Sequence, residues 1–255
     1  MAFINASFFS PVLGKEVGMH VIMPETGRGP FPVLYLLHGL SDDHSTWHRR
    51  TRIEYYVHQL PLIVAMPDGF RGFYTDNNEG PAYGRYMMED VIGFVERTFP
   101  AMRKRGGRCI GGLSMGGYGA LRLALAHPNM FASAHSHSGA FAASTVTYKN
   151  FWRESERYRT FGPHPKGSAH DVFALARKLK SGGKRIPQLR IDCGEQDTLI
   201  GCNRELHAHL NRLKIRHEYI ECPGEHNWDF WDKRIRGALV FHRHALKIRS
   251  KIRRP

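Results

Sequence analysis

Continuous apolar runs and amphipathic stretches alternate along most of the chain. Runs such as 31–37 and 62–66 have the length of strands buried on both faces, and the stretches between them have helical spacing. Because such alternation is typical of parallel strands joined by helices, it predicts a mostly parallel sheet with helices on both faces. The predicted strands are 31–37, 62–66, 108–110, 131–138, 188–193 and 216–221, and the predicted helices are 47–59, 86–98, 115–126, 171–179, 199–213 and one after Trp228.

Two regions depart from this alternation. Residues 3–9 and 16–23 are β-like and lack an intervening helix, which predicts an antiparallel hairpin at one edge of the sheet. Residues 139–170 mix aromatic and basic positions without a period, so we expect a lid-like insertion over the strand ends. No repeat or low-complexity linker divides the sequence, and residues 1–255 are predicted to form a single α/β domain.

A glycine-rich segment, Gly112-Leu-Ser-Met-Gly116, follows the predicted strand at 108–110. It fits G-x-S-x-G, the turn that exposes a nucleophilic serine between a strand and a helix in α/β-hydrolases. The pattern is short, and the alternative is a packing turn with a bystander serine. The preceding strand and the small-residue helix that follows favour Ser114 as the nucleophile.

A serine hydroxyl is a weak nucleophile and needs a base oriented by a carboxylate. In this fold the acid and then the histidine follow the serine along the chain. Asp197 and His226 lie in loops just after two successive predicted strands, where open α/β sheets place their sites. The rivals Asp192 and His217 lie within or at the start of a strand, and Glu195 precedes the turn that carries Asp197.

Acyl transfer also needs donors for the negatively charged oxygen of the tetrahedral intermediate. The expected pair is the N–H after the nucleophile and an N–H in the loop after an earlier strand. These are the backbone N–H groups of Met115 and Leu40. His38, which precedes that loop, is expected to be a buried, hydrogen-bonded histidine.

Five segments of the chain resemble the esterase family that includes tributyrin esterases, feruloyl esterases, S-formylglutathione hydrolases and mycolyltransferases. They are 38–47, 66–69, 112–121, 194–197 and 224–228. The resemblance implies the α/β-hydrolase fold, the triad Ser114, Asp197 and His226, and Leu40 and Met115 as oxyanion donors. Within the family the chain is most similar to the tributyrin and feruloyl esterases, because Ser41-Asp42-Asp43 stands where the formylglutathione enzymes carry a cysteine-containing segment.

Four aromatic residues are candidates for binding the substrate: Trp47, Tyr148, Trp152 and Trp228. Tyr148 and Trp152 belong to the insertion, whose aromatics could line an acyl or aryl pocket or form a small core of their own. Isolated aromatics beside basic residues do not make a continuous apolar groove. We therefore expect short-acyl or aryl esters to be preferred over long fatty esters.

The chain carries 37 Lys and Arg against 23 Asp and Glu, a formal net charge of +14. We expect much of this excess positive charge to be dispersed over the surface, with local clusters at 103–108 and 247–254. No nucleic-acid module or accompanying aromatics occur, so nucleic acid is not the expected partner. No apolar run is long enough to span a membrane, no leader is recognised at 1–16, and four cysteines without a C-x-x-C pair favour reduced thiols. A cytoplasmic protein is predicted, and a homo-oligomer is left open.

Three H-x-H pairs, 135/137, 207/209 and 242/244, raise the question of a metal. No carboxylate or cysteine completes a site beside them, so neither a metal nor another cofactor is predicted. The predicted function is a serine carboxylic-ester hydrolase that works through an acyl-enzyme. Alternatives are an acyltransferase or thioesterase with the same triad and, in another class, a non-catalytic basic binding protein on a hydrolase scaffold.

Overall fold

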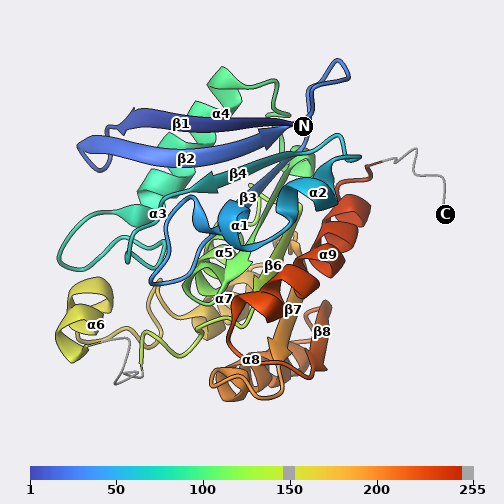
Figure 1. Cartoon of the computed structure of the whole chain (residues 1–255). Helices are drawn as coiled ribbons and strands as arrows, with labels where there is room; N and C mark the ends of the chain where they lie inside the picture. The colour runs from blue at the N-terminus through green and yellow to red at the C-terminus, as the bar shows by residue number, and fades with distance from the viewer. Residues whose placement is uncertain (146–152, 249–255) are drawn as a thin grey trace.

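A mixed sheet of eight strands forms the centre of the protein, seen in a computed structural model that describes residues 1–145 and 153–248 (Figure 1). Its strand order is β1-β2-β4-β3-β5-β6-β7-β8. The pairs β1–β2 and β2–β4 are antiparallel, and all later pairs are parallel. The predicted parallel sheet with an antiparallel edge is therefore confirmed. The strands are β1 Ala2–Ser10, β2 Lys15–Met23, β3 Val33–Leu37, β4 Ile63–Pro67, β5 Arg108–Leu113, β6 Ser133–His137, β7 Gln188–Gly194 and β8 His217–Cys222.

Helices cover both faces of this sheet and bury two apolar layers. One layer packs the sheet against α4, α5, α7 and α8, and the other packs it against α1, α2 and α9. The strands β3 and β4 are buried at every position, as their continuous apolar runs predict. The helices are α1 Thr46–Arg50, α2 Ile53–Val57, α3 Tyr83–Arg85, the π-helical η1 Tyr86–Val91, α4 Ile92–Thr98, the 3-10 turn η2 Arg105–Gly107, α5 Met115–Ala126, α6 Glu154–Phe161, α7 Val172–Ser181, α8 Ile200–Arg212 and α9 Trp228–Ala245.

The predicted helix 47–59 is wrong as a continuous element, because the structure divides it into α1 and α2. The hydroxyl of Thr51 donates to Trp47 O at 2.6 Å and accepts from Ile53 N–H at 3.2 Å. Thr51 also has an extended backbone. A threonine side chain that bonds to nearby backbone groups competes with the helical ladder, which ends α1 here.

Strand β6 is polar in sequence, Ser133-Ala-His-Ser-His137, yet every residue in it is buried. Its histidines find partners on neighbouring elements. His135 Nδ1 lies 2.6 Å from His242 Nε2 on α9, and His137 Nδ1 lies 2.6 Å from an oxygen of Asp192 on β7. Buried polar groups need such hydrogen-bond partners. Here the two contacts connect β6 to β7 and to α9.

Candidate active site

Ser114 occupies the turn between β5 and α5, where its backbone has a φ of 51° and a ψ of −115°. This left-handed conformation is costly for a residue with a side chain and persists only where the surroundings hold it. A Cβ at Gly112 would lie 2.5 Å from Leu37 O, and one at Gly116 would lie 2.6 Å from His38 O. Glycine at both positions is therefore a steric requirement of the turn. The Ser114 N–H donates to His137 O at 2.9 Å, which fixes the turn to β6.

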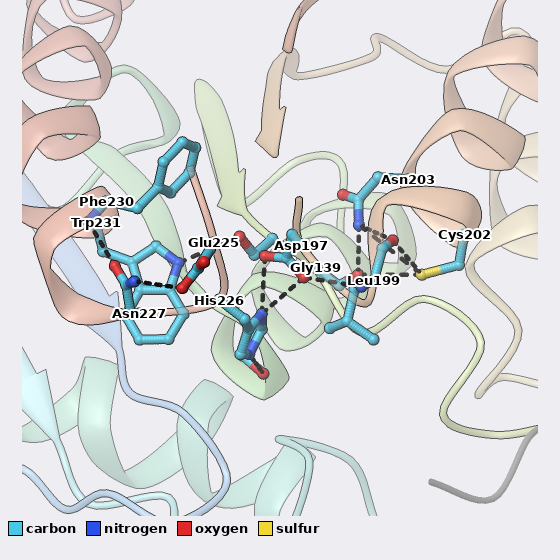
Figure 2. A network of polar contacts seen from close by, with 12 residues as sticks. Gly139, Asp197, Leu199, Cys202, Asn203, Glu225, His226, Asn227, Phe230 and Trp231 are labelled. Atoms are coloured by element: carbon cyan, nitrogen blue, oxygen red, sulfur yellow. Dashed lines mark hydrogen bonds and ion pairs between the residues drawn. The ribbon is translucent and has the colours of Figure 1, made fainter. Parts of the chain in front are cut away.

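A chain of hydrogen bonds leads from this serine to a buried carboxylate. His226 Nε2 lies 3.0 Å from Ser114 Oγ, and His226 Nδ1 lies 2.9 Å and 3.0 Å from the two oxygens of Asp197. Figure 2 shows His226 and Asp197 pointing toward one another. The histidine side chain is 29% exposed and the aspartate side chain is fully buried. The structure thus brings Ser114, Asp197 and His226 into the geometry of a nucleophile, a base and an orienting acid.

The environment keeps Asp197 ionised. Burial alone would raise the pKa of this carboxyl, but the hydrogen bond and charge of His226 outweigh it, with help from the Ser138 hydroxyl and the Leu199 N–H. The Leu199 N–H donates to Asp197 at 2.8 Å. The net effect holds the pKa of Asp197 below its ordinary value. A charged acceptor is what a histidine needs in order to keep its Nδ1 proton directed inward.

The loops that carry Asp197 and His226 are joined to one another. Gln196 N–H donates to Gly224 O at 3.0 Å, and its side-chain oxygen accepts from Gly224 N–H at 2.8 Å. Asn227 then caps α9 by accepting from Phe230 N–H at 3.0 Å. These hydrogen bonds hold the two loops together. They therefore help to fix the distance between Asp197 and His226.

Three tryptophan rings pack in series next to His226. Trp231 meets the imidazole edge to face, with ring centroids 4.9 Å apart, and its indole N–H donates to Ser138 Oγ at 3.2 Å. Trp228 packs on Trp231 at 5.2 Å, and Trp47 packs on Trp228 at 5.3 Å. Such edge-to-face contacts restrict each ring to one orientation.

A cavity of about 630 Å³ opens beside Ser114. Trp228 lines it, whereas Trp47 is 1% exposed, donates to Leu37 O at 2.9 Å and belongs to the core behind it. Tyr148 and Trp152 lie outside the described residues. The lining residues are Gly39, Leu40, Ser41, Asp42, Arg71, Phe73, Leu113, Ser114, Met115, Ala140, Ala143, Thr198, Leu199, His226, Asn227, Trp228 and Trp231.

Leu40 and Met115, the expected oxyanion donors, both lie along this cavity beside Ser114. Side chains of two flanking residues, His38 and Asp42, hold the turn that carries Leu40. Asp42 accepts from Gly39 N–H at 3.0 Å, and the buried His38 contacts Gly39 O at 2.7 Å while accepting from Gly69 N–H at 2.8 Å. The expectation that His38 is a buried, hydrogen-bonded histidine is confirmed. The site thus has a rigid backbone turn facing the serine.

The cavity has cationic and acidic groups that sequence reasoning missed. Arg71, in the loop after β4, forms a two-point ion pair with Glu156 on α6 at 2.5 and 2.9 Å. This pair joins the cavity wall to the described part of segment 139–170. On the other side, burial raises the pKa of the Asp42 carboxyl. The position of Arg71 just after the carboxyl end of a parallel strand is the signal that could have identified it.

Within the described part of the chain, no group of three or more histidine, cysteine, aspartate or glutamate residues is placed to hold a metal ion. In the same residues, no helix combines the length and apolarity needed to cross a membrane. All four cysteines are free thiols, and three of them are buried.

The sequence and the fold are similar to those of known esterases. Residues 10–242 match the family described as "Putative esterase". An acetyl esterase of Caldicellulosiruptor saccharolyticus is 33% identical, over 94% of this chain and 97% of that protein. Among solved structures, the fluorophosphonate-binding serine hydrolase F of Staphylococcus aureus is 32% identical with a TM-score of 0.87, covering 94% of this chain and 98% of that one.

An S-formylglutathione hydrolase of Staphylococcus aureus is also similar, at 33% identity and a TM-score of 0.86 over 94% of this chain and 98% of the other. A ferulic acid esterase with 19% identity and a TM-score of 0.83 shares the fold. The family match covers most of the sequence, and the two structural relatives above 30% identity are hydrolases by name. The chain therefore belongs to the "Putative esterase" family and is a carboxylesterase of the α/β-hydrolase fold.

Proposed function

We propose that the enzyme hydrolyses esters through a covalent acyl-enzyme formed on Ser114. His226 takes the proton of the serine hydroxyl as the oxygen attacks the ester carbonyl, and returns it to the departing alcohol. Water then attacks the carbonyl of the acyl-enzyme while His226 takes its proton, and His226 returns that proton to Ser114 Oγ as the bond between the acyl group and the serine oxygen breaks. The observation that carries this proposal is the continuous hydrogen-bond chain from Ser114 Oγ through His226 to Asp197.

The backbone N–H groups of Leu40 and Met115 serve as the oxyanion hole in this mechanism. Met115 is the first residue of α5, so its N–H belongs to the set that a helix leaves without an internal partner. The positive end of the helix dipole adds to its attraction for a developing negative charge. Leu40 supplies the second donor from the turn held by Asp42 and His38.

Short-acyl or aryl esters are the proposed substrates. The cavity lining includes the aromatic residues Phe73, Trp228 and Trp231 together with the charged residues Asp42 and Arg71. This combination suits a compact acyl group and a hydroxyl-bearing alcohol better than a long alkyl chain. The acetyl esterase among the relatives supports a small acyl group. We propose that the described residues of the insertion, 139–145 and 153–170, form a lid-like border of the cavity, because Ala140 and Ala143 line it and Glu156 binds Arg71 at its wall.

Thioester hydrolysis is the second candidate, favoured by the 33% identity to an S-formylglutathione hydrolase. The chemistry would use the same residues and differ in the leaving group. Transfer of the acyl group to an alcohol would likewise differ only in the acceptor that reaches the acyl-enzyme.

A substrate series separates these candidates. We expect kcat/KM on p-nitrophenyl esters to be highest at about C2 to C4 and to fall for longer chains, because the charged residues Asp42 and Arg71 share the cavity lining with its apolar residues. Methyl ferulate, an acetylated sugar and S-formylglutathione are assayed beside them. An optimum at about C10 or longer would contradict the proposed substrate class, and a preference for the thioester would replace it.

A reducing compartment is the proposed setting, consistent with the four free thiols. Cys109 is fully buried, and burial raises its pKa well above the ordinary value, which keeps the thiol protonated and unreactive. The cytoplasm fits these properties. A small-molecule ester remains the expected partner.

A further inference from the structure

The excess positive charge of the chain gathers at one edge of the molecule. We define the basic edge as the Lys and Arg residues of 103–105, 178–185 and 212–216, together with Lys247. These segments hold eleven of the 37 basic residues and none of the 23 acidic ones. Four further basic residues fall in 249–255, outside the described part of the chain. The other 22 basic residues are then balanced by the 23 acidic ones. The sequence interpretation named clusters at 103–108 and 247–254 and treated much of the excess as dispersed, whereas 178–185 and 212–216 hold seven of these charges.

The parallel sheet explains why these distant segments converge. Residues 103–105, 178–185 and 212–216 precede β5, β7 and β8, and parallel strands begin at the same edge of a sheet. The contacts agree, because Lys180 Nζ donates to Lys214 O at 3.4 Å. After burial, the nearby charge of Arg185 is the second cause that lowers the pKa of Arg105.

Lys247 reaches the same edge from α9. This helix packs along β6 and β7, and its His242 contacts Ser133, the first residue of β6, at 2.8 Å. In Figure 1 the red helix α9 runs from the lower part of the molecule, where α6 lies, toward the opposite end. Ser114 follows the other end of β5, which at six residues is about 20 Å long. The basic edge and the catalytic cavity thus face opposite ways.

The cations of the basic edge lack acidic partners, unlike many basic residues elsewhere. Among the residues described, none of the eleven forms an ion pair with a carboxylate, and ten of them are exposed. Elsewhere the arginines at 52, 71, 85, 108, 157, 190 and 204 each pair with an aspartate or glutamate. Gathering unpaired like charges costs self-repulsion, which a polyanionic partner would relieve.

We propose that the basic edge docks the enzyme on an anionic lipid surface, with the catalytic cavity facing the solvent. The cations come from the last turns of α7 and α8, from the loops before β5, β7 and β8, and from the residues after α9. They cover an area rather than a single groove, which fits a flat array of headgroups. No exposed large apolar residue of the described chain lies in these segments. Stacking on nucleic-acid bases and insertion into the bilayer would both need such residues, whereas electrostatic attachment does not.

The test compares the binding of two charge variants to vesicles. One variant, Lys184→Gln/Arg185→Gln/Lys214→Gln/Arg216→Gln, removes four charges from the basic edge. The matched control, Lys15→Gln/Arg49→Gln/Arg50→Gln/Lys233→Gln, removes four exposed charges elsewhere. Binding is measured by co-sedimentation with phosphatidylcholine vesicles, with and without about 30% phosphatidylglycerol, at about 50 and 500 mM salt. Hydrolysis of p-nitrophenyl acetate reports that both variants are folded.

We expect the wild-type enzyme and the control variant to bind the anionic vesicles at low salt and to release them at high salt. The basic-edge variant should bind at least about tenfold more weakly with its activity unchanged. Equal weakening in both variants would overturn the proposal, because net charge alone would then explain binding. Failure of the wild type to prefer anionic vesicles, or tighter binding to duplex DNA with the same dependence on the edge, would overturn it as well.

Discussion

Two histidine–aspartate pairs lie at neighbouring strands of the sheet and differ in what surrounds them. His137 and Asp192 are 2.6 Å apart and fully buried, whereas His226 is 29% exposed and lies 2.9 Å from the buried Asp197. The two pairs also differ in the contacts of the second ring nitrogen of the histidine, Nε2. Nε2 of His226 reaches Ser114, while Nε2 of His137 is buried without a hydrogen-bond partner in the described residues. A histidine–carboxylate pair becomes a candidate for catalysis when it meets both a nucleophile and a cavity.

The charges around Asp192 indicate a structural role for the buried pair. Arg190 and Arg234 lie 3.5 Å and 3.6 Å from this carboxylate, and Arg190 also pairs with Glu218 at 2.7 Å. The group therefore connects β6, β7, β8 and α9. Removing one partner of such a buried network leaves charge without compensation, which is strongly destabilising.

The largest expected effect comes from the residues at the reacting end of the proposed triad. Ser114→Ala and His226→Ala should each lower kcat by at least about 10³, because the members of a triad act as a unit. The measurement is kcat on p-nitrophenyl acetate, with circular dichroism to verify folding. Activity near the wild-type value in either variant would contradict the assignment.

Asparagine substitutions compare the two acids directly. Asp197→Asn should lower kcat by up to about 10⁴-fold, since it removes the charge that orients His226. Asp192→Asn should keep kcat per folded molecule near wild type and lower the free energy of unfolding by about 3 kcal/mol. Steady-state kinetics and urea denaturation of both variants separate the effects. A larger loss of kcat in Asp192→Asn would mean that the wrong acid has been assigned.

A further comparison concerns pH and the histidines beside the buried pair. Burial, with the charges of His137 and Arg190, lowers the pKa of His242 from 6.5 to about 3. Burial likewise lowers the pKa of His135 well below its ordinary value. The unfolded chain then binds more protons than the folded one below about pH 6.5. The free energy of unfolding should fall as the pH drops from there toward 3, by up to about 1.4 kcal/mol per pH unit for each histidine. Urea denaturation between pH 7 and 4 measures this, and an unchanged midpoint would contradict it.

The two pairs also show how far sequence reasoning reaches. The sequence could predict that Ser114, Asp197 and His226 lie together as a candidate triad, because a glycine-dependent turn and two loops at strand ends follow a fixed order along the chain. The sequence could not predict that Ser138 and Trp231 support the site. Their role depends on one side-chain hydrogen bond between residues that are 93 positions apart. The prediction that Trp47 lines the pocket is wrong. Its aromatic type suggested a pocket residue, but its side chain is buried in the core and donates to Leu37 O. The sequence indicated basic clusters at 103–108 and 247–254. It could not show that 178–185 and 212–216 belong to the same edge, because these segments are distant in sequence and meet only through the sheet.

Labelling with a fluorophosphonate tests the central claim most directly, since the reagent needs an activated serine. Peptide mapping by mass spectrometry should find one adduct per chain, on Ser114. Labelling should be slow in Asp197→Asn and His226→Ala and unchanged in Asp192→Asn. An adduct on another serine, or labelling of the Ser114→Ala variant at the wild-type rate, would contradict the account.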